Sequence, residues 1–382
     1  MKFFNIDQHI SVIADIKHIF SSLGHTVEDK TLSGHAHIMG RNVDDIPELN
    51  GDKWCGTLGN QDKIDAFYAK YKDMLDKYDG FICTYPPLFA KLFERTGKPI
   101  IIQAPIRFDY TLENNAEAHK GWCEWLASGV DRGQIILCAN NRLDQEYMEA
   151  YVGRPVTHLP SLCEYTGMQY DYKNIKFNLV LYYASRQIPY LLTSRFGRKY
   201  DMLQHGYPWE ILLQFNGIVH FPYQISTMSI FEQYTANIPL FFPSKQFITK
   251  LYNENLVALK DMVECHRTGV RYWDENNRLF ILDQVSFYEI FNREPKSVRM
   301  PNLKIDPNNY FDMATVKWWI DRADYYDEKW MPAITYFDGY EDLNKNIREF
   351  DYEKASKMMA QSNKMRKEAV YSKWTEIINN IK

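Results

Sequence analysis

The sequence predicts an α/β fold made of two doubly wound, Rossmann-like domains. Short apolar runs typical of buried parallel strands alternate with segments whose apolar residues recur every three or four positions, as in amphipathic helices. This alternation runs from residue 2 to about residue 160 and starts again at residue 177. The length of 382 residues also exceeds what one hydrophobic core usually serves. We therefore expect domains at 1–162 and 163–350 that face each other across a cleft, and a closing segment at 351–382.

The first half is predicted to begin with a strand at residues 2–7 and a helix from Ile10 to about Gly24. Strands connected through helices run parallel, so the carboxyl ends of these strands are expected to share one edge of a sheet. Further strands are predicted at 80–83, 99–102, 134–139 and 155–159, and further helices at 61–78, before Gly97 and up to about Tyr151.

A linker is predicted at residues 160–175, and a second strand and helix series follows it. The final helix, near 351–380, is amphipathic, with Trp374, Ile377 and Ile381 along one face. The strands of the second series are predicted at 177–183, 202–205, 218–221 and 238–242, and its helices at 209–215, 230–236 and within 314–326.

Composition excludes several classes of protein. The net charge of −4, with both signs mixed along the chain, provides no basic field for a nucleic-acid backbone. Six cysteines occur without a Cys-x-x-Cys pair, no charged and apolar leader precedes the first strand, and no apolar run reaches the roughly 18 residues of a membrane span. We expect a cytoplasmic protein with reduced thiols and no integral membrane segment.

The stretch from His205 to Ser244 carries the most chemical information. A strand is predicted to end at Phe221, and a polar loop from Tyr223 to Thr227 leads into a helix. The free backbone N–H groups at such a helix start suit a diphosphate. Ser226, Thr227 and Ser229 add hydroxyl groups, and the Glu232 carboxylate can accept two hydrogen bonds from a ribose diol. The alternative is a serine-rich helix cap without a ligand.

This stretch resembles the donor-binding region of GT-B glycosyltransferases, in which a helical Glu is followed seven residues later by the Pro that opens the next strand. Here those residues are Glu232 and Pro239. The resemblance implies that Glu232 binds the nucleotide ribose, that the loop from Ser226 to Ser229 binds the diphosphate, and that Tyr207 flanks the base. It also implies a final helix that crosses back to the first domain. The donor-binding set expected from this region also includes Tyr223 and Met228.

Two positions depart from the family pattern. Gln224 stands eight residues before Glu232, where many retaining members have a second Glu, and Asn237 replaces a common Gly. Both departures weaken assignment to the retaining subgroup.

The departing diphosphate needs cationic or N–H groups. Ser185 and Arg186, which follow the first strand of the second half, are the preferred candidates, and Arg195, Arg198 and Lys199 are alternatives. Because no Asp-x-Asp triplet occurs, we expect a reaction that needs neither a metal nor another cofactor.

An inverting transfer also needs a general base, and histidine suits neutral pH. His9 is the leading candidate because it follows the first strand at the start of the first helix, with Asp7 or Asp109 to orient it. A histidine that only caps the helix is the alternative. His35 and His37 are rivals, and their His-x-His spacing lacks a third metal ligand.

Acceptor binding is assigned to His35, Arg107 and Asn140, since the last two follow predicted strands at the same sheet edge. Ordinary loop capping would explain the Asn pair at 140–141 equally well.

The predicted function is therefore transfer of a hexosyl or pentosyl group from a nucleotide-diphosphate sugar to a hydroxyl acceptor, expected to be a glycan. The course is predicted to be inverting, with a retaining course still open. A nucleotide-sugar 2-epimerase and a non-catalytic carbohydrate- or nucleotide-binding protein are the alternatives. A dehydrogenase is disfavoured because no Gly-x-Gly-x-x-Gly follows the first strand of either domain.

Overall fold

The computed structural model divides the chain into two compact units. Of the residues it describes, unit 1 holds those from Met1 to Tyr165 and from Lys367 onward, and unit 2 holds those from Thr166 to Arg366. The described residues are 1–49, 61–110, 112, 116–182, 200–202, 207–222, 224–254, 257, 259, 271–274, 279–282, 305, 307 and 312–381.

Unit 1 is built on a parallel sheet of six strands in the order β2-β1-β3-β4-β5-β6. Its strands are β1 (Lys2–Asp7), β2 (Thr26–Thr31), β3 (Gly80–Cys83), β4 (Ile100–Ala104), β5 (Ile135–Ala139) and β6 (Thr157–His158). Its α-helices are α1 (Ile10–Ser22), α2 (Gln61–Leu75), α3 (Ala116–Asp131) and α4 (Arg142–Val152), and its 3-10 helices are η1 (Ala36–Met39), η3 (Pro87–Thr96) and η4 (Glu164–Thr166, which crosses the unit boundary).

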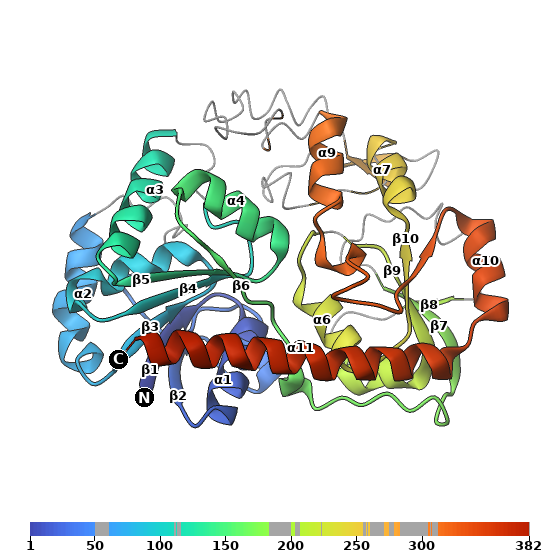
Figure 1. Ribbon diagram of the computed structural model, residues 1–382, viewed down its shortest axis with the longest axis horizontal. Coiled ribbons are helices and arrows are strands. Elements are labelled where there is room, and N and C mark those ends of the chain that lie inside the picture. The colour runs from blue at the N-terminus through green and yellow to red at the C-terminus, as the bar shows by residue number, and fades with distance from the viewer. Residues whose placement is uncertain are drawn as a thin grey trace. The chain divides into compact units, whose positions relative to one another are not determined.

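The direction of the crossovers decides which face each helix covers. The connection from β1 to β2 moves one way along the sheet, and every later connection moves the other way. Because such crossovers are right-handed, α1 covers one face, whereas α3 and α4 cover the opposite face (Figure 1). The order of the strands reverses between β1 and β3, so the carboxyl ends of these two strands flank the switch point of the sheet.

Unit 2 has a second parallel sheet, in the order β13-β10-β9-β7-β8. The order of the strands in this sheet reverses between β7 and β9. The strands are β7 (Phe177–Tyr182), β8 (Tyr200–Met202), β9 (Phe215–His220), β10 (Leu240–Pro243) and β13 (Thr335–Phe337), with an antiparallel pair of β11 (Arg271–Asp274) and β12 (Leu279–Leu282). The helices are η6 (Trp209–Gln214), α6 (Met228–Thr235), α7 (Lys245–Asn253), α9 (Met313–Ile320), η7 (Asp324–Tyr326), α10 (Tyr340–Glu349) and α11 (Tyr352–Asn380).

The α/β architecture with two doubly wound parallel sheets is confirmed. Several local predictions were wrong. The segments predicted as helices before Gly97 and at 209–215 are the 3-10 helices η3 and η6, and β9 begins at Phe215 rather than at residue 218. The predicted strand at 155–159 is only β6, and most of the predicted strand at 202–205 lies outside the described residues.

Helix α11 contributes side chains to both units. Its residues up to Arg366 belong to unit 2 and those from Lys367 onward to unit 1. In unit 1 the buried Trp374 packs edge-on against Phe20 of α1, with ring centroids 4.9 Å apart. The part of α11 that belongs to unit 1 therefore covers α1 with an aromatic contact.

A buried carboxylate fixes the chain where it leaves the sheet of unit 1. Asp15 of α1 accepts hydrogen bonds from the backbone N–H groups of Leu162 (3.2 Å) and Cys163 (2.7 Å). Cys163 has a positive φ of 57°, a conformation that costs free energy outside glycine. Burial raises the pKa of Asp15 from 3.8 to about 6, against the lowering effect of these hydrogen bonds.

This raised pKa leads to a pH-dependent prediction for Asp15→Asn. Since the folded state holds the proton below about pH 6 and the unfolded state only below about 3.8, acidification through this window stabilises the wild-type fold. The variant has no such proton to take up. Its deficit in unfolding free energy, measured by urea denaturation, should therefore be about 1 kcal/mol larger at pH 5 than at pH 7. The exposed Asp76→Asn is the control, and an equal deficit at both pH values would contradict the assignment.

Candidate active site

The switch point of the unit 2 sheet carries the predicted donor region. Strands β7 and β9 are paired in parallel, and Tyr182 lies opposite His220 at their carboxyl ends. The chain leaves β9 through the loop that ends at Thr227 and then enters α6. Ligands of open α/β sheets bind at this kind of position, outside the carboxyl ends of the strands where the order reverses. The predicted loop and helix therefore stand at the ligand-binding position of their sheet.

The start of α6 gathers polar groups of the kind that bind an anion. Thr227 is the N-cap residue in extended conformation, yet its side chain makes no capping hydrogen bond to the helix. Its hydroxyl instead lies 3.2 Å from the hydroxyl of Ser229. The N–H groups at the start of an α-helix have no carbonyl four residues earlier in the helix to bind, and here the N–H of Ile230 donates to the carbonyl oxygen of Thr227 (3.1 Å). Two hydroxyl groups and the helix N-terminus are thus gathered at one point, and Ser226, Thr227 and Met228 around it are mostly buried.

Glu232 lies on the second turn of α6 and is largely buried, with 7% of its surface exposed. A carboxylate at this depth is costly unless it is hydrogen-bonded or paired. Its place on the same helix as Ser229, three residues further on, puts it on the same side of α6 as the polar start. The ribose-binding role that the resemblance implies for Glu232 stays a prediction.

The other end of α6 is held by α11. Asn363 donates from Nδ2 to the carbonyl oxygen of Tyr234 (2.9 Å) and to Oδ1 of Asn237 (2.8 Å). Asn237 has a φ of 64°, the left-handed conformation that ends many helices. An asparagine tolerates this conformation, and here its side chain also gains a partner. The departure from Gly at this position therefore has a structural reason.

His220, which sequence reasoning overlooked, ends β9 beside this helix. It is fully buried, its Nδ1 donates to Oε1 of Gln233 on α6 (2.9 Å), and its ring stacks on Phe242 with centroids 5.0 Å apart. Burial lowers the pKa of His220 to about 4, so the ring is neutral at pH 7. The contact ties the strand to the helix that follows it.

In unit 1, the switch point between β1 and β3 is organised by a buried carboxylate. Asp7 ends β1 and accepts hydrogen bonds from the backbone N–H groups of His9 and Tyr85 (2.9 Å for Tyr85). One side chain therefore clamps the loops after both strands. Burial raises the pKa of Asp7 well above its usual value, although these two hydrogen bonds act to lower it. Asp7 was predicted to orient the His9 ring, and the structure shows that it holds the backbone instead.

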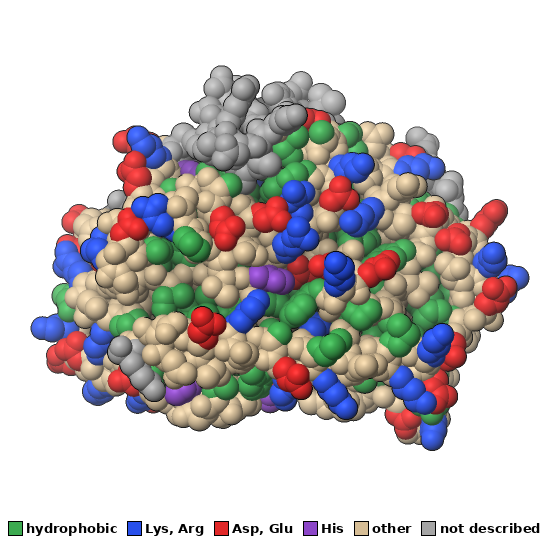
Figure 2. Space-filling view, viewed as in Figure 1, with side chains coloured by type: hydrophobic (Ala, Val, Ile, Leu, Met, Phe, Trp, Pro, Cys, Tyr) green, Lys and Arg blue, Asp and Glu red, His purple; other side chains and the backbone are tan. Residues whose placement is uncertain are grey.

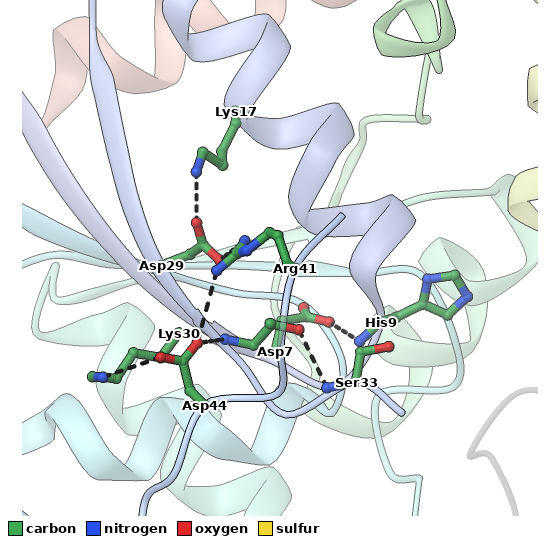
Figure 3. A network of polar contacts seen from close by, with 9 residues as sticks. Asp7, His9, Lys17, Asp29, Lys30, Ser33, Arg41 and Asp44 are labelled. Atoms are coloured by element: carbon green, nitrogen blue, oxygen red, sulfur yellow. Dashed lines mark hydrogen bonds and ion pairs between the residues drawn. The ribbon is translucent and has the colours of Figure 1, made fainter. Parts of the chain in front are cut away.

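The imidazole of His9 extends away from the Asp7 carboxylate (Figure 3). Its Nδ1 is buried without a hydrogen-bond partner, and its ring meets Tyr85 edge-on with centroids 5.8 Å apart. Burial lowers the pKa of His9 to about 4, and the nearby His35 adds to this effect. At neutral pH the ring is therefore uncharged and able to accept a proton.

A network of ion pairs holds the loop that carries His35. Lys17 of α1 and Arg41 both pair with Asp29 of β2, and Lys30 and Arg41 pair with Asp44 (Figure 3). The Asp44 carboxylate also accepts the backbone N–H of Thr31 (2.8 Å). Residues 36–39 of this loop form the 3-10 helix η1, with His35 as its N-cap residue and His37 exposed within it.

Arg107 and Asp109 are enclosed in unit 1. The guanidinium donates to the Asp109 carboxylate (3.0 and 3.1 Å) and to the hydroxyl of Tyr147 (2.6 Å), which itself donates to Asp109 (3.0 Å). His119 Nε2 lies 3.2 Å from the same carboxylate. All four side chains are almost fully buried. This cluster links the loop after β4 to α3 and α4.

Asn140, after β5, is also buried. Its Oδ1 accepts the backbone N–H of Ser161, and its neighbour Asn141 caps α4 by accepting the N–H of Asp144 (2.8 Å). The Asn140 side chain therefore holds a loop, and the Asn141 side chain caps a helix.

The remaining predicted residues are placed as follows. Tyr207 is half-buried just before η6 in unit 2. Ser185, Arg186 and Tyr223 lie outside the described residues, as do the alternatives Arg195, Arg198 and Lys199.

Two absences hold for the described part of the chain. There, no three His, Cys, Asp or Glu residues are grouped so as to hold a metal ion. Nor, over the same residues, does a helix combine the length and the apolar character that crossing a bilayer requires.

Comparison with known proteins finds structural likenesses only. No protein-family model and no curated protein sequence matches the chain. Among solved structures, it is similar to the kitacinnamycin glycotransferase (10% identity, TM-score 0.46, covering 100% of this chain and 98% of that one). It is also similar to the calicheamicin glycosyltransferase CalG4 (8% identity, TM-score 0.43, covering 100% of this chain and 97% of that one). A third similar structure is the spinosyn rhamnosyltransferase SpnG complexed with thymidine diphosphate (9% identity, TM-score 0.41, covering 97% of this chain and 99% of that one). Likenesses at this level assign no family, so function has to be judged from the residues of the site.

Proposed function

We propose that the protein is a glycosyltransferase that moves a sugar from a nucleotide-diphosphate donor to a hydroxyl group. The observation that carries this proposal is the start of α6. The N-terminus of α6, the Thr227 and Ser229 hydroxyls and the Glu232 carboxylate lie on one helix at the switch point of a parallel sheet. A diphosphate linked to a ribose presents the complementary groups in the same order.

In this proposal unit 2 binds the donor. The N–H groups and hydroxyls at the start of α6 bind the diphosphate, and they also stabilise the charge that it gains as the bond to the sugar breaks. Glu232 accepts hydrogen bonds from the ribose hydroxyls, and Tyr207 lies against the base. Ser185, Arg186 and Tyr223 are proposed to complete the donor site.

His9 of unit 1 is proposed as the general base. The neutral ring takes the proton from the acceptor hydroxyl as that oxygen attacks the anomeric carbon, and the diphosphate leaves from the opposite side, which inverts the configuration. Asp7 sets the position of His9 through its backbone N–H rather than through the ring. The acceptor is proposed to be a glycan bound near His35, and the protein is proposed to act in the cytoplasm without a metal ion.

Thermal shift with free nucleotide diphosphates tests the donor site. UDP, GDP and dTDP are each added to the wild type, and at least one should raise the melting temperature, because a ligand that binds only the folded state stabilises it. Glu232→Ala should remove most of this shift, since the loss of two hydrogen bonds to a carboxylate costs about 3 kcal/mol of binding, or a factor of roughly 100.

Glu349→Ala is the matched control, because Glu349 is an exposed glutamate at the end of α10. It should keep the full shift. If no nucleotide diphosphate shifts the wild type, or if Glu232→Ala responds as strongly as the control, the donor site is not at α6.

A further inference from the structure

A cavity between α7 and α9 of unit 2 has no part in the function proposed above. Its volume is about 520 Å³, within the range of roughly 300–1,000 Å³ that small-molecule sites occupy. Helix α7 lines it with Lys245, Gln246 and Lys250, and α9 lines it with Lys317 and Asp321. Both helices lie in the same unit, so the cavity belongs to one folded body.

Helical periodicity explains why these polar side chains share the cavity. On α7, Lys245, Thr249 and Asn253 follow one another at intervals of four residues, as do Met313, Lys317 and Asp321 on α9. Residues at this spacing lie on one side of a helix. The opposite sides are committed to the core, where Phe247, Ile248 and Leu251 of α7 and Val316 and Trp319 of α9 are buried.

The cavity is positively charged, with three lysines against one aspartate. Lys245 is partly neutralised, because its Nζ lies 3.4 Å from Oδ1 of Asp321. Among the described residues, Lys250 has only a long ion-pair contact of 3.9 Å, with Glu254 at the C-cap of α7, and such exposed pairs are weak. Lys317 forms no ion pair with any residue that the structure describes. Two ammonium groups, one from each helix, are therefore available to an anion.

The rest of the lining indicates what else the anion carries. Gln246 and Asn253 provide amide donors, whereas Met313 and Ile320 provide apolar contact. Blue Lys and Arg side chains and green apolar ones also stand close together on the surface where α9 lies (Figures 1 and 2). A lysine ammonium binds phosphate as a point charge without demanding one geometry.

We propose that the cavity between α7 and α9 is a binding site for a phosphate group attached to a partly apolar ligand. A soluble phosphate ester and an anionic lipid headgroup share this chemistry. None of the residues that line the cavity is among those assigned to the donor site.

Inorganic pyrophosphate is the probe for the soluble source, measured by calorimetric titration of the full chain. Lys250→Gln/Lys317→Gln should weaken binding at this site by about tenfold, since both lysines are exposed and each adds only a weak charge interaction with the anion. Lys354→Gln/Lys364→Gln, which removes two lysines of α11 instead, should bind like the wild type. Rising salt should weaken the wild-type interaction.

Thr227→Val/Ser229→Ala separates this site from the donor site. If both proposals hold, the wild type binds two pyrophosphates. The Thr227/Ser229 variant then keeps the cavity site at full affinity, and the Lys250/Lys317 variant keeps the donor site at full affinity with the cavity site weakened about tenfold. If only the donor proposal fails, the wild type binds one pyrophosphate, about tenfold more weakly in the Lys250/Lys317 variant and unchanged in the Thr227/Ser229 variant.

Flotation with phosphatidylcholine vesicles, with and without phosphatidylglycerol, tests the lipid source. Binding that needs phosphatidylglycerol and is lost in the Lys250/Lys317 variant identifies a headgroup as the ligand, whereas pyrophosphate binding alone identifies a soluble ester. The proposal is overturned if the wild type binds neither probe, or if the Lys250/Lys317 and Lys354/Lys364 variants bind both probes equally well.

Discussion

Replacing His9 by Ala should lower kcat/KM for sugar transfer by a factor of about 10²–10⁴, the usual contribution of a general base. The reason is that His9 presents a neutral ring whose buried Nδ1 has no hydrogen-bond partner, at the switch point of the unit 1 sheet. The measurement is the initial rate with the nucleotide sugar identified by the thermal-shift screen. Nucleotide binding should be unchanged in the variant, because the proposed donor residues belong to unit 2.

His37→Ala is the control for this experiment. His37 is an exposed histidine and was a rival for the same role. It should keep nearly full activity. A large loss in His37→Ala with little loss in His9→Ala would transfer the catalytic role to the loop of η1.

The pH dependence of kcat/KM offers a second readout for His9. Because burial lowers the pKa of His9 to about 4, the ring stays able to accept a proton well below the usual histidine range. The acidic limb of the profile should therefore fall near pH 4 rather than near 6.5, over the range in which the protein remains folded. An acidic limb at 6 or above would mean that another group is the base.

Trp374→Ala should produce the largest loss of stability, about 3–5 kcal/mol of unfolding free energy, as for other large core residues cut back to alanine. Trp374 is 1% exposed and packs on Phe20, so the truncation leaves a cavity between α11 and α1. Chemical denaturation followed by fluorescence and by circular dichroism measures the loss and shows whether the two units unfold together.

Met365→Ala is the matched control on the same helix, since Met365 is 58% exposed. It should change the unfolding free energy by no more than about 0.5 kcal/mol. A loss below about 1 kcal/mol in Trp374→Ala would show that the end of α11 adds little to the core of unit 1.

Elements with a clear apolar period were predictable from the sequence. Strand β1 with α1, and β9 with α6, each join a buried run to an amphipathic segment, and both pairs were placed nearly correctly. Strand β2 was missed because its sequence, Thr-Val-Glu-Asp-Lys-Thr, is mostly polar. Because it is an edge strand, β2 needs few buried side chains. Its charged residues form ion pairs with residues elsewhere in the chain, as Asp29 does with Lys17 and Arg41.

At the candidate site, too, the sequence predicted local features and missed contacts between distant parts of the chain. The polar start of α6 is local in sequence, so its position at the beginning of a helix could be predicted. Arg107 and Asp109 follow a strand as predicted, but Tyr147 and His119, which enclose them, come from helices far along the chain. The pairing of His220 with Gln233 likewise depends on how α6 packs against β9, and no single-sequence pattern records that packing.

The shared helix α11 also constrains the order in which the protein can mature. The segment up to Tyr165 is synthesised first, yet the aromatic ring that covers Phe20 belongs to Trp374, far later in the chain. During translation the early segment therefore leaves the ribosome with an uncovered apolar surface, and it can bury that surface only after Trp374 has also emerged. A nascent chain stalled short of Trp374 should consequently be bound by chaperones and cut by proteases more readily than the released protein.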